Sequence, residues 1–304
     1  MENTAISWTD HTINLWWGCS KVSPGCKNCY ADTFSRRWGK DIWGPGKPRE
    51  DHRKNAIKTA LKLEREAQAT INRIKADIGN ASEYNDIAYD RPRIFCSSMS
   101  DWLDDEVPIE WLADLLELIW NTPNLDWLLL SKRPENWETR MRKAYASRPS
   151  TASMQWVAAW IHDTIKPFPA SAHPFPRIPQ NVWIGTTVED QQRADERIPQ
   201  LLKIPAKVRF LSCEPLLEPL HLLLGPNLPP GSPLLAWLWG IDWLICGGES
   251  GPGFRPFNPD WARTLRDQCK AAHVPFHMKQ MGGLKPSTMP PIPDDLMIRE
   301  LPTT

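Results

Sequence analysis

The segment Asp126-Trp127-Leu128-Leu129-Leu130-Ser131 decides the expected fold, because it is a short, unbroken apolar run between polar residues. Runs of this length and composition are typical of strands that are buried on both faces of a parallel sheet. Further runs of the same kind lie on either side of it, at residues 13–17, 93–97, 181–186, 208–212, 243–246 and 274–279. The sequence therefore predicts a sheet of several parallel strands.

Amphipathic helices are predicted between these strands, because apolar residues there recur at intervals of three and four. The repeats occupy residues 56–78, 112–119, 194–202 and 261–269. Asn258 and Pro259 suit the N-cap and the first position of the last helix. Alternating strands and helices predict a parallel sheet with helices outside it, either open and doubly wound or curled as a barrel. Since no Gly-x-Gly-x-x-Gly fingerprint follows the first strand, we expect an α/β fold that forms a full or partial TIM-like barrel.

The chain is expected to form one barrel-like domain over residues 1–304, a length that such barrels reach without a second core. Two Pro-rich segments interrupt the pattern, near residues 146–180 and 225–233. Both are predicted to be surface excursions or lids.

Charge and hydropathy exclude some classes of protein. Lys+Arg and Asp+Glu both number 36, so no overall positive field favours non-specific nucleic-acid binding. There is no run of about 18 apolar residues that would predict a membrane span, and residues 1–10 lack the pattern of a signal peptide. We therefore expect a cytoplasmic protein without membrane contact, whose seven cysteines are reduced.

Three cysteines lie close together in the sequence, as Cys19-x6-Cys26-x2-Cys29. Such clustering in a reducing compartment indicates a metal site, and the turn at Pro24-Gly25 would let the chain double back. A [4Fe–4S] cluster on three cysteines leaves one iron open for another ligand. Structural zinc is the alternative and normally needs a fourth protein ligand, for which His11 is the nearest upstream candidate. Three inert thiols are the remaining interpretation, and Cys96, Cys213, Cys246 and Cys269 are expected to be small buried hydrophobes.

Polar or glycine residues follow most of the predicted strands, and parallel strands bring their carboxyl ends to one face. The candidate site residues at these positions are Ser98, Ser100, Asp101, Lys132, Glu189, Glu214, Gly247, Gly248, Glu249 and Lys279. Carboxylates, cations and hydroxyls on one rim are the expected layout of a barrel active site. Glu214 as a base and Lys279 as the partner of an anionic group are the candidate catalytic residues. Arg133, which precedes Pro134, is expected at the surface.

An ordered series of short motifs resembles the phage-associated three-Cys-motif proteins, a family without an assigned activity. The motifs are Ser23-Pro24-Gly25-Cys26-x2-Cys29-Tyr30-Ala31, Ser98-Met99-Ser100-Asp101, Lys132-Arg133-Pro134-Glu135-Asn136, Glu214-Pro215-Leu216, Gly247-Gly248-Glu249-Ser250-Gly251 and Lys279-Gln280. The resemblance extends from about Ile6 to Gly283.

The chain is also distantly similar to the radical S-adenosylmethionine (SAM) superfamily, which uses full or partial barrels. That resemblance implies that Cys19, Cys26 and Cys29 ligate a [4Fe–4S] cluster and that the open iron takes SAM. It implies further that Gly247-Gly248-Glu249 hold the SAM amine. The cysteine spacing differs from the usual x3 then x2, and the usual Gly-Gly-Glu follows the second strand rather than a late one.

Two functional hypotheses follow. The first is a radical SAM-type enzyme that takes electrons from a reductant protein and acts on a nucleic acid, a nucleoside or a partner protein, with Trp16, Trp17, Trp102 and Trp183 as residues that could stack on a base. The second is a zinc-stabilised binding protein without catalytic activity. Nucleic acid is its candidate ligand and would dock on the basic helix at residues 52–75. An ordinary solvated outer helix is the preferred interpretation of that segment. The sequence assigns no oligomeric state.

Overall fold

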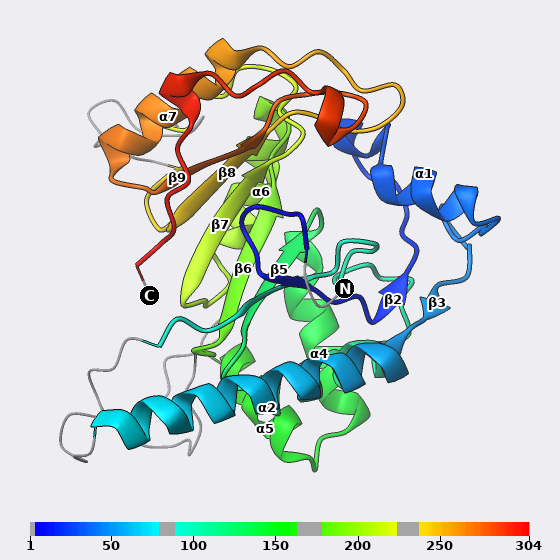
Figure 1. Cartoon of the computed structure of the whole chain (residues 1–304). Coiled ribbons are helices and arrows are strands. Elements are labelled where there is room, and N and C mark those ends of the chain that lie inside the picture. Colours follow the sequence, from blue (N-terminus) through cyan, green and yellow to red (C-terminus); the bar gives the residue numbers. More distant parts are fainter. Residues whose placement is uncertain (1–3, 79–88, 163–177, 224–236, 304) are drawn as a thin grey trace.

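The computed structural model describes residues 4–78, 89–162, 178–223 and 237–303 and places seven parallel strands in one curled sheet (Figure 1). In spatial order the strands are β1 (His11–Thr12), β4 (Arg93–Cys96), β5 (Asp126–Ser131), β6 (Val182–Thr187), β7 (Val208–Cys213), β8 (Trp243–Gly247) and β9 (Phe276–Gln280). Because the strands lie in chain order, the right-handed crossovers carry their helices to the same face of the sheet. The prediction of a parallel α/β fold is confirmed in its partial form, a half-barrel with β1 and β9 at its edges.

Six of the seven predicted strands begin and end within two residues of the observed ones. The prediction for residues 13–17 was wrong, because the sheet strand is β1, which ends at Thr12. Within that segment, Trp16–Trp17 forms β2, which pairs antiparallel with β3 (Glu50–Asp51) in a separate two-stranded sheet. Leu15 and Trp16 are fully buried in the main core, so their apolar character reflects packing rather than a place in the parallel sheet.

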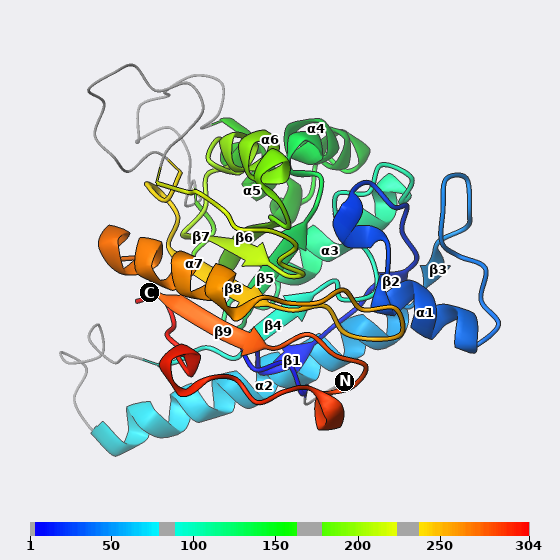
Figure 2. The same cartoon turned by 90° about the horizontal axis from the view of Figure 1, so that it is seen from above.

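The four predicted helices are α2 (Arg53–Ile78), α3 (Ile109–Trp120), α6 (Gln191–Leu201) and α7 (Pro259–Ala272). Asn258 caps α7 as predicted, since its side chain accepts a hydrogen bond of 2.9 Å from the amide of Asp260. Three further helices were not predicted, namely α1 (Tyr30–Arg37), α4 (Trp137–Ser147) and α5 (Ala152–His162). Short 3-10 helices are η1 (Pro24–Cys26), η3 (Pro134–Asn136), η5 (Pro286–Thr288) and η6 (Asp294–Leu296). Figure 2 shows α3, α4, α5 and α6 grouped along one side of the sheet.

The expectation of a surface excursion near residues 146–180 was wrong for its first part. Helix α5 lies there and buries Trp156, Val157 and Trp160 in the main core. Its apolar residues are spread around the helix, so it is enclosed between neighbours instead of lying on the surface. Residues 163–177, and the whole predicted insertion at 225–233, lie outside the described residues.

Two apolar layers flank the sheet. The larger lies between the strands and the helices, and the smaller fills the concave face with aromatic side chains. The concave layer consists of Trp8, Phe95, Leu128, Trp183, Val208, Phe210, Trp243 and Ile245. Trp8 comes from the segment before β1, and its neighbour Ser7 lies 2.9 Å from the Nε2 atom of His277 in β9. The amino-terminal segment therefore bridges the open side of the half-barrel.

The carboxyl-terminal segment covers the edge of β9 that no other sheet strand pairs with. Its residue Arg299 forms an antiparallel bridge with His277. The amide of Met278 donates to the carbonyl of Ile298 at 2.8 Å. Covering an edge strand in this way prevents it from pairing with another chain. Within the described ranges, no helix has the length and apolar character needed to cross a membrane.

Candidate metal centre

The cysteine loop begins at Gly18, where the backbone takes a conformation that other residues rarely adopt. Its φ is +106°, and a Cβ atom there would lie only 2.5 Å from the carbonyl oxygen of Ile42. The amide of Gly18 donates to the carbonyl of Met99 at 3.0 Å, just beyond β4. Glycine at this position therefore lets the chain turn tightly along the carboxyl ends of the strands before reaching Cys19.

The three cysteines are free of disulfides, like the other four. Cys19 is buried with Ala31, Ile42, Trp43 and Met99, and half-buried Cys29 packs against the same cluster. Cys26 ends η1, and Cys29 is the N-cap of α1. Among the described residues, no three or more His, Cys, Asp or Glu side chains already form a group that could hold a metal ion.

Arg133 joins Cys19 to the end of β5. Its Nη1 atom lies 3.5 Å from the Sγ atom of Cys19 and 2.9 Å from a carboxylate oxygen of Asp101, and its Nη2 atom donates to the carbonyl of Ser20 at 2.7 Å. The prediction that Arg133 lies at the surface was wrong, since only 4% of it is exposed. Asp101 also accepts from the Ser131 hydroxyl at 2.6 Å, so the end of β5 and the loop after β4 are fixed together.

Glu189, after β6, holds the middle of the cysteine loop. One carboxylate oxygen accepts from the amide of Gly25 at 3.1 Å, and the other accepts from Arg197 at 2.8 Å. A Cβ atom at Gly25 would lie 3.0 Å from this carboxylate, so a larger residue would crowd it. Burial opposes ionisation of Glu189, but Arg197 and Lys132 lower its pKa below the ordinary value.

Glu249, after β8, holds the far side of the same loop. Its carboxylate accepts from Asn28 at 3.0 Å and from the Arg255 guanidinium at 2.6 and 3.0 Å, while Arg255 also donates to the carbonyl of Pro24. Although burial opposes ionisation, Arg255 and Asn28 lower the pKa of Glu249. Both carboxylate oxygens therefore have partners within the protein, and the observed role of Glu249 is to position the loop.

The electrostatic surroundings of the three thiols differ. Burial raises the pKa of Cys19 to about 12, against the opposing effect of Arg133, and burial also raises the pKa of Cys29. The pKa of Cys26 is lowered, because Lys132 and nearby backbone amides outweigh burial. Metal binding to such thiols releases their protons, and adjacent cations favour the thiolates that result. Three sulfur donors suit a group that is held by cysteine thiolates, but the surroundings favour the thiolate at Cys26 alone, and burial opposes it at Cys19 and Cys29.

A second group of predicted residues lies inside the rim. Lys279 of β9 pairs with Glu214, which follows β7, at 3.1 Å. The pair spans β8 at Gly247, where a Cβ atom would lie 3.3 Å from the Oε1 atom of Glu214. That Oε1 atom is buried and has no hydrogen-bond partner among the described residues. Lys132 reaches the hydroxyl of Thr187 at 3.2 Å and faces the same interior.

The remaining predicted residues have more local roles. The Ser98 hydroxyl bonds to Asn14 at 3.0 Å, whereas the buried Ser100 hydroxyl has no partner among the described residues. Gly247 and Gly248 were expected to let backbone approach a ligand. At Gly248 the space is filled instead by the chain's own backbone, since a Cβ atom there would lie 2.3 Å from the amide nitrogen of Gly282.

Four residues that position the loop were not identified from the sequence, namely Asn28, Arg133, Arg197 and Arg255. Asn28 and Arg133 act on residues that are distant in sequence, 221 positions away at Glu249 and 114 positions away at Cys19. Arg197 and Arg255 lie only eight and six positions after the glutamates that they hold, but nothing in the sequence pattern pairs them. One signal was present for Arg133, because it comes directly after Lys132, two residues past the end of β5.

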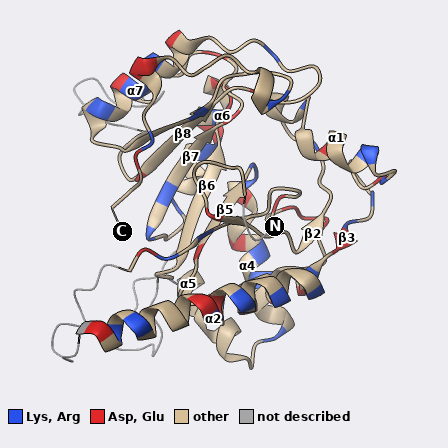
Figure 3. Ribbon diagram, in the orientation of Figure 1, with Lys and Arg blue, Asp and Glu red and all other residues tan. Residues whose placement is uncertain are grey.

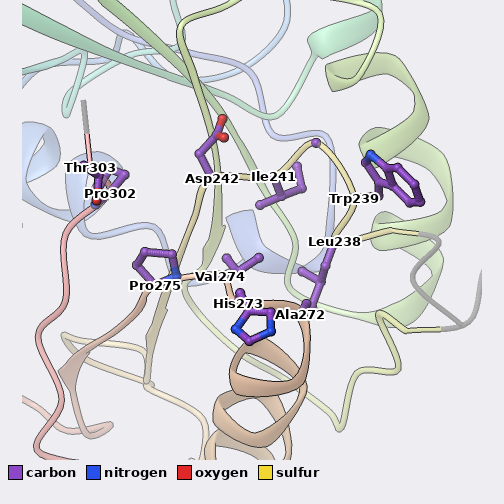
Figure 4. A pocket seen from close by; sticks show the side chains of 11 residues that line it. Leu238, Trp239, Ile241, Asp242, Ala272, His273, Val274, Pro275, Pro302 and Thr303 are labelled. Carbon is purple, nitrogen blue, oxygen red and sulfur yellow. The ribbon is translucent and has the colours of Figure 1, made fainter.

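A cavity of about 470 Å³ lies elsewhere, at the amino ends of β8 and β9 (Figure 4). Trp239, Asp242 and His273 are among its lining residues, and no predicted site residue is. Because catalytic groups of parallel α/β barrels collect at the carboxyl ends of strands, this cavity is not the candidate site.

Fold and site together define a parallel α/β half-barrel protein with a three-cysteine loop fixed across its carboxyl rim. The chain belongs to the family described as "Protein of unknown function (DUF5131)", whose model matches residues 3–301. Neither the curated proteins nor the solved structures gave a match. The family description names no activity, cofactor or partner.

Proposed function

We propose that this chain is an iron–sulfur protein in which Cys19, Cys26 and Cys29 ligate a [4Fe–4S] cluster, and that it is a radical SAM-type enzyme. The observation that carries the proposal is the way the loop is fixed. Separate strand ends hold it through Arg133, Glu189 and Glu249, although a loop of no function would need no such support.

The surroundings of the thiols support a cluster of this kind. Cations next to cysteine ligands offset the negative charge that thiolates and a cluster bring into a half-buried site. Lys132 and Arg133 supply such cations from the end of one strand, β5. A [4Fe–4S] cluster with three protein ligands and SAM on its open iron supplies the one-electron chemistry of the radical SAM class, with a reductant protein as electron source.

The interior of the rim supports a role in catalysis. One carboxylate oxygen of Glu214 accepts from Lys279, and the other is buried and has no partner among the residues that the structure describes. A buried acceptor without a hydrogen bond is costly unless something else satisfies it. We assign that oxygen to a hydrogen-bond donor of the substrate, and Lys279 to holding Glu214 ionised and in place. Glu249 has two roles in the proposal. It positions the loop through Arg255 and Asn28, and it contacts the amine of SAM.

The proposal is tested by anaerobic purification, iron and sulfide analysis, visible absorption, and EPR of the dithionite-reduced protein with and without SAM. We expect a brown protein with about four irons, an absorption that bleaches on reduction, and an EPR signal that SAM alters. Cys19→Ala, Cys26→Ala and Cys29→Ala should each lose iron. Cys269→Ala on α7 is the matched control and should keep it.

The outcomes separate the parts of the proposal. A colourless protein with one tightly bound zinc would overturn it and favour a zinc-stabilised binding protein. A cluster whose EPR signal does not respond to SAM would retain the iron–sulfur assignment and contradict the radical SAM assignment. Equal iron loss in the Cys269→Ala control would show that the loop cysteines are not the ligands.

A further inference from the structure

Helix α1, which begins directly after Cys29, and its C-cap residue Trp38 present a row of exposed aromatic side chains. Tyr30, Phe34 and Trp38 follow one another at intervals of four residues and are 47%, 41% and 68% exposed. The ring centroids of Phe34 and Trp38 are 6.1 Å apart, and Trp17 lies 5.9 Å from Phe34 on the inner side. Large exposed side chains at regular helical spacing mark an interaction surface rather than scattered surface residues.

The charge around this row is strongly one-sided. Residues 20–40 contain five Lys and Arg but one acid, Asp32, although the whole chain has no net charge. Asp32 is buried and pairs with Lys21 and Arg36. Figure 3 shows the basic residues on α1 at the margin of the molecule. Nearby Glu50 and Asp41 are paired with lysines, Glu50 with Lys40 and Asp41 with Lys47.

We propose that this face, formed by Lys27, Tyr30, Phe34, Arg36, Arg37 and Trp38 and called here the α1 surface, binds single-stranded nucleic acid. Aromatic rings with exposed faces stack on unpaired bases, and cations beside them contact the phosphates between those bases. A duplex hides its base faces, so it lacks the first of these contacts. An acidic protein would use the cations but would not require aromatic side chains in particular.

Burial decides which tryptophans are available to stack on a base. Trp16, Trp102 and Trp183, which the sequence suggested for this role, are buried. Trp17 is packed beneath the α1 surface, between Phe34 and His52 and under the Lys40 ammonium. The exposed row on α1 takes their place. None of its six residues is a proposed metal ligand, so this inference holds whether or not a cluster is bound.

The α1 surface adjoins the candidate metal centre, because Cys29 is the N-cap of α1 and Lys27 lies between the last two cysteines of the motif. A strand bound there would run beside the carboxyl rim. The surface therefore identifies the chemical class of a ligand that the neighbouring rim could act on.

The test uses the full chain and a fluorescein-labelled oligothymidine and oligouridine, with binding followed by fluorescence anisotropy at several salt concentrations. We expect Trp38→Ala and Phe34→Ala each to weaken binding about tenfold. Trp239→Ala is the matched control. Trp239 is 69% exposed, like Trp38, but it lines the cavity at the amino ends of β8 and β9 and is not part of the α1 surface. Arg37→Glu should weaken binding and reduce its salt dependence, by about 0.7 in the log–log slope for each cation lost, while Arg73→Glu on α2 should not.

Three further measurements make the outcome decisive. A duplex of the same length should compete poorly. No binding at low salt, or equal binding by the wild type, Trp38→Ala and Phe34→Ala, would overturn the proposal. Displacement by polyglutamate as strong as by oligothymidine, with no effect of Trp38→Ala, would show a surface for acidic proteins and would also overturn it. Iron content measured on the same preparations shows whether any variant has disturbed the metal centre instead.

Discussion

At the scale of single residues, Asp101 joins the loop after β4 to the end of β5 and, through Arg133, to the cysteine loop. Its carboxylate accepts from Ser131, from the amides of Leu103 and Lys132, and from the Arg133 guanidinium. Arg133 and Asp101 are both buried. Removal of one partner from a buried ion pair leaves the other charge without compensation, which costs far more than the pair contributes by itself.

We therefore expect Asp101→Asn to lower the free energy of unfolding by about 3 kcal/mol, measured by urea denaturation. Glu138→Gln is the matched control, because it breaks an exposed ion pair with Arg142 on α4 and should cost less than about 1 kcal/mol. Equal losses in the two variants would show that burial of the Asp101–Arg133 pair has no special weight.

Glu249 can be examined by comparing it with its partner. If its main role is to hold the loop through Arg255 and Asn28, Glu249→Gln and Arg255→Gln should loosen the loop alike. Loss of charge-assisted hydrogen bonds costs about 2 kcal/mol, roughly a thirtyfold shift toward the open loop. Hydrogen exchange of the peptide around Cys26 measures this shift, and Arg263→Gln, on an exposed ion pair, is the control.

The same pair of variants tests the proposed contact with SAM. A contact between Glu249 and the SAM amine predicts that Glu249→Gln abolishes the effect of SAM on the EPR signal, whereas Arg255→Gln retains it. Equal retention in both variants would leave Glu249 with its positioning role alone. Sequence could single out Cys19, Cys26 and Cys29 because their spacing is unusual. Asn28 gains meaning only when folding brings it to Glu249, 221 positions away, and Arg255 only when folding brings Pro24 to it.

At the scale of elements, the strands were predictable because strands buried on both faces are continuous apolar runs. Helices with a clear apolar stripe, such as α3 and α7, were predictable for a similar reason. Helix α4 was missed because its sequence is mostly polar. Helix α5 is itself mostly apolar and was missed because it lies within the Pro-rich segment 146–180. Both are stabilised by neighbours, since α4 packs against α3 and α5. Tertiary packing, rather than local pattern, determines these two helices.

Helix α7 shows how much a local signal contributes. The Asn258 side chain satisfies an amide of the first turn, and Pro259 occupies the first helical position, where no amide partner is needed. Asn258→Ala should lower the free energy of unfolding by about 1 kcal/mol, measured by urea denaturation. Asn258→Asp, which keeps the cap, should be close to the wild type; a loss as large as that of the alanine variant would contradict the capping role.

At the scale of the whole molecule, the order of the strands determines where chemistry can occur. Because the strands lie in chain order, the helices leave the concave face of the sheet free. The aromatic layer that includes Trp8 packs on that face instead. Polar groups such as Glu214, Lys279 and Lys132 then occupy the carboxyl end. Sequence could predict the parallel strands and their polar ends but not the degree of closure, which depends on how the segments before β1 and after β9 pack against the sheet edges.

His277 lies at the seam between these segments, with Ser7 on one side and the strand bridge to Arg299 on the other. Burial, helped by Arg299 and Lys279, lowers the pKa of His277 to about 4, from 6.5 for an ordinary histidine. The native state therefore keeps this imidazole neutral at pH values where the unfolded chain has already bound a proton. By linkage, the contribution of His277 to the free energy of unfolding is fully present above pH 6.5 and is lost as the pH falls toward 4.

The expected loss over that window is about 3 kcal/mol, on top of the effect of carboxylates that titrate nearby. His277→Asn cannot titrate, and it keeps a group able to bond with Ser7. We compare the free energy of unfolding of the wild type and of His277→Asn by urea denaturation between pH 7.5 and 4. As the pH falls, the wild type should lose more stability than the variant. A difference that stays constant across the range would mean that the imidazole is protonated equally in both states. In that case the seam would not be closed tightly enough to keep the residue dry, and the bridging role of the amino-terminal segment would have to rest on Trp8 alone.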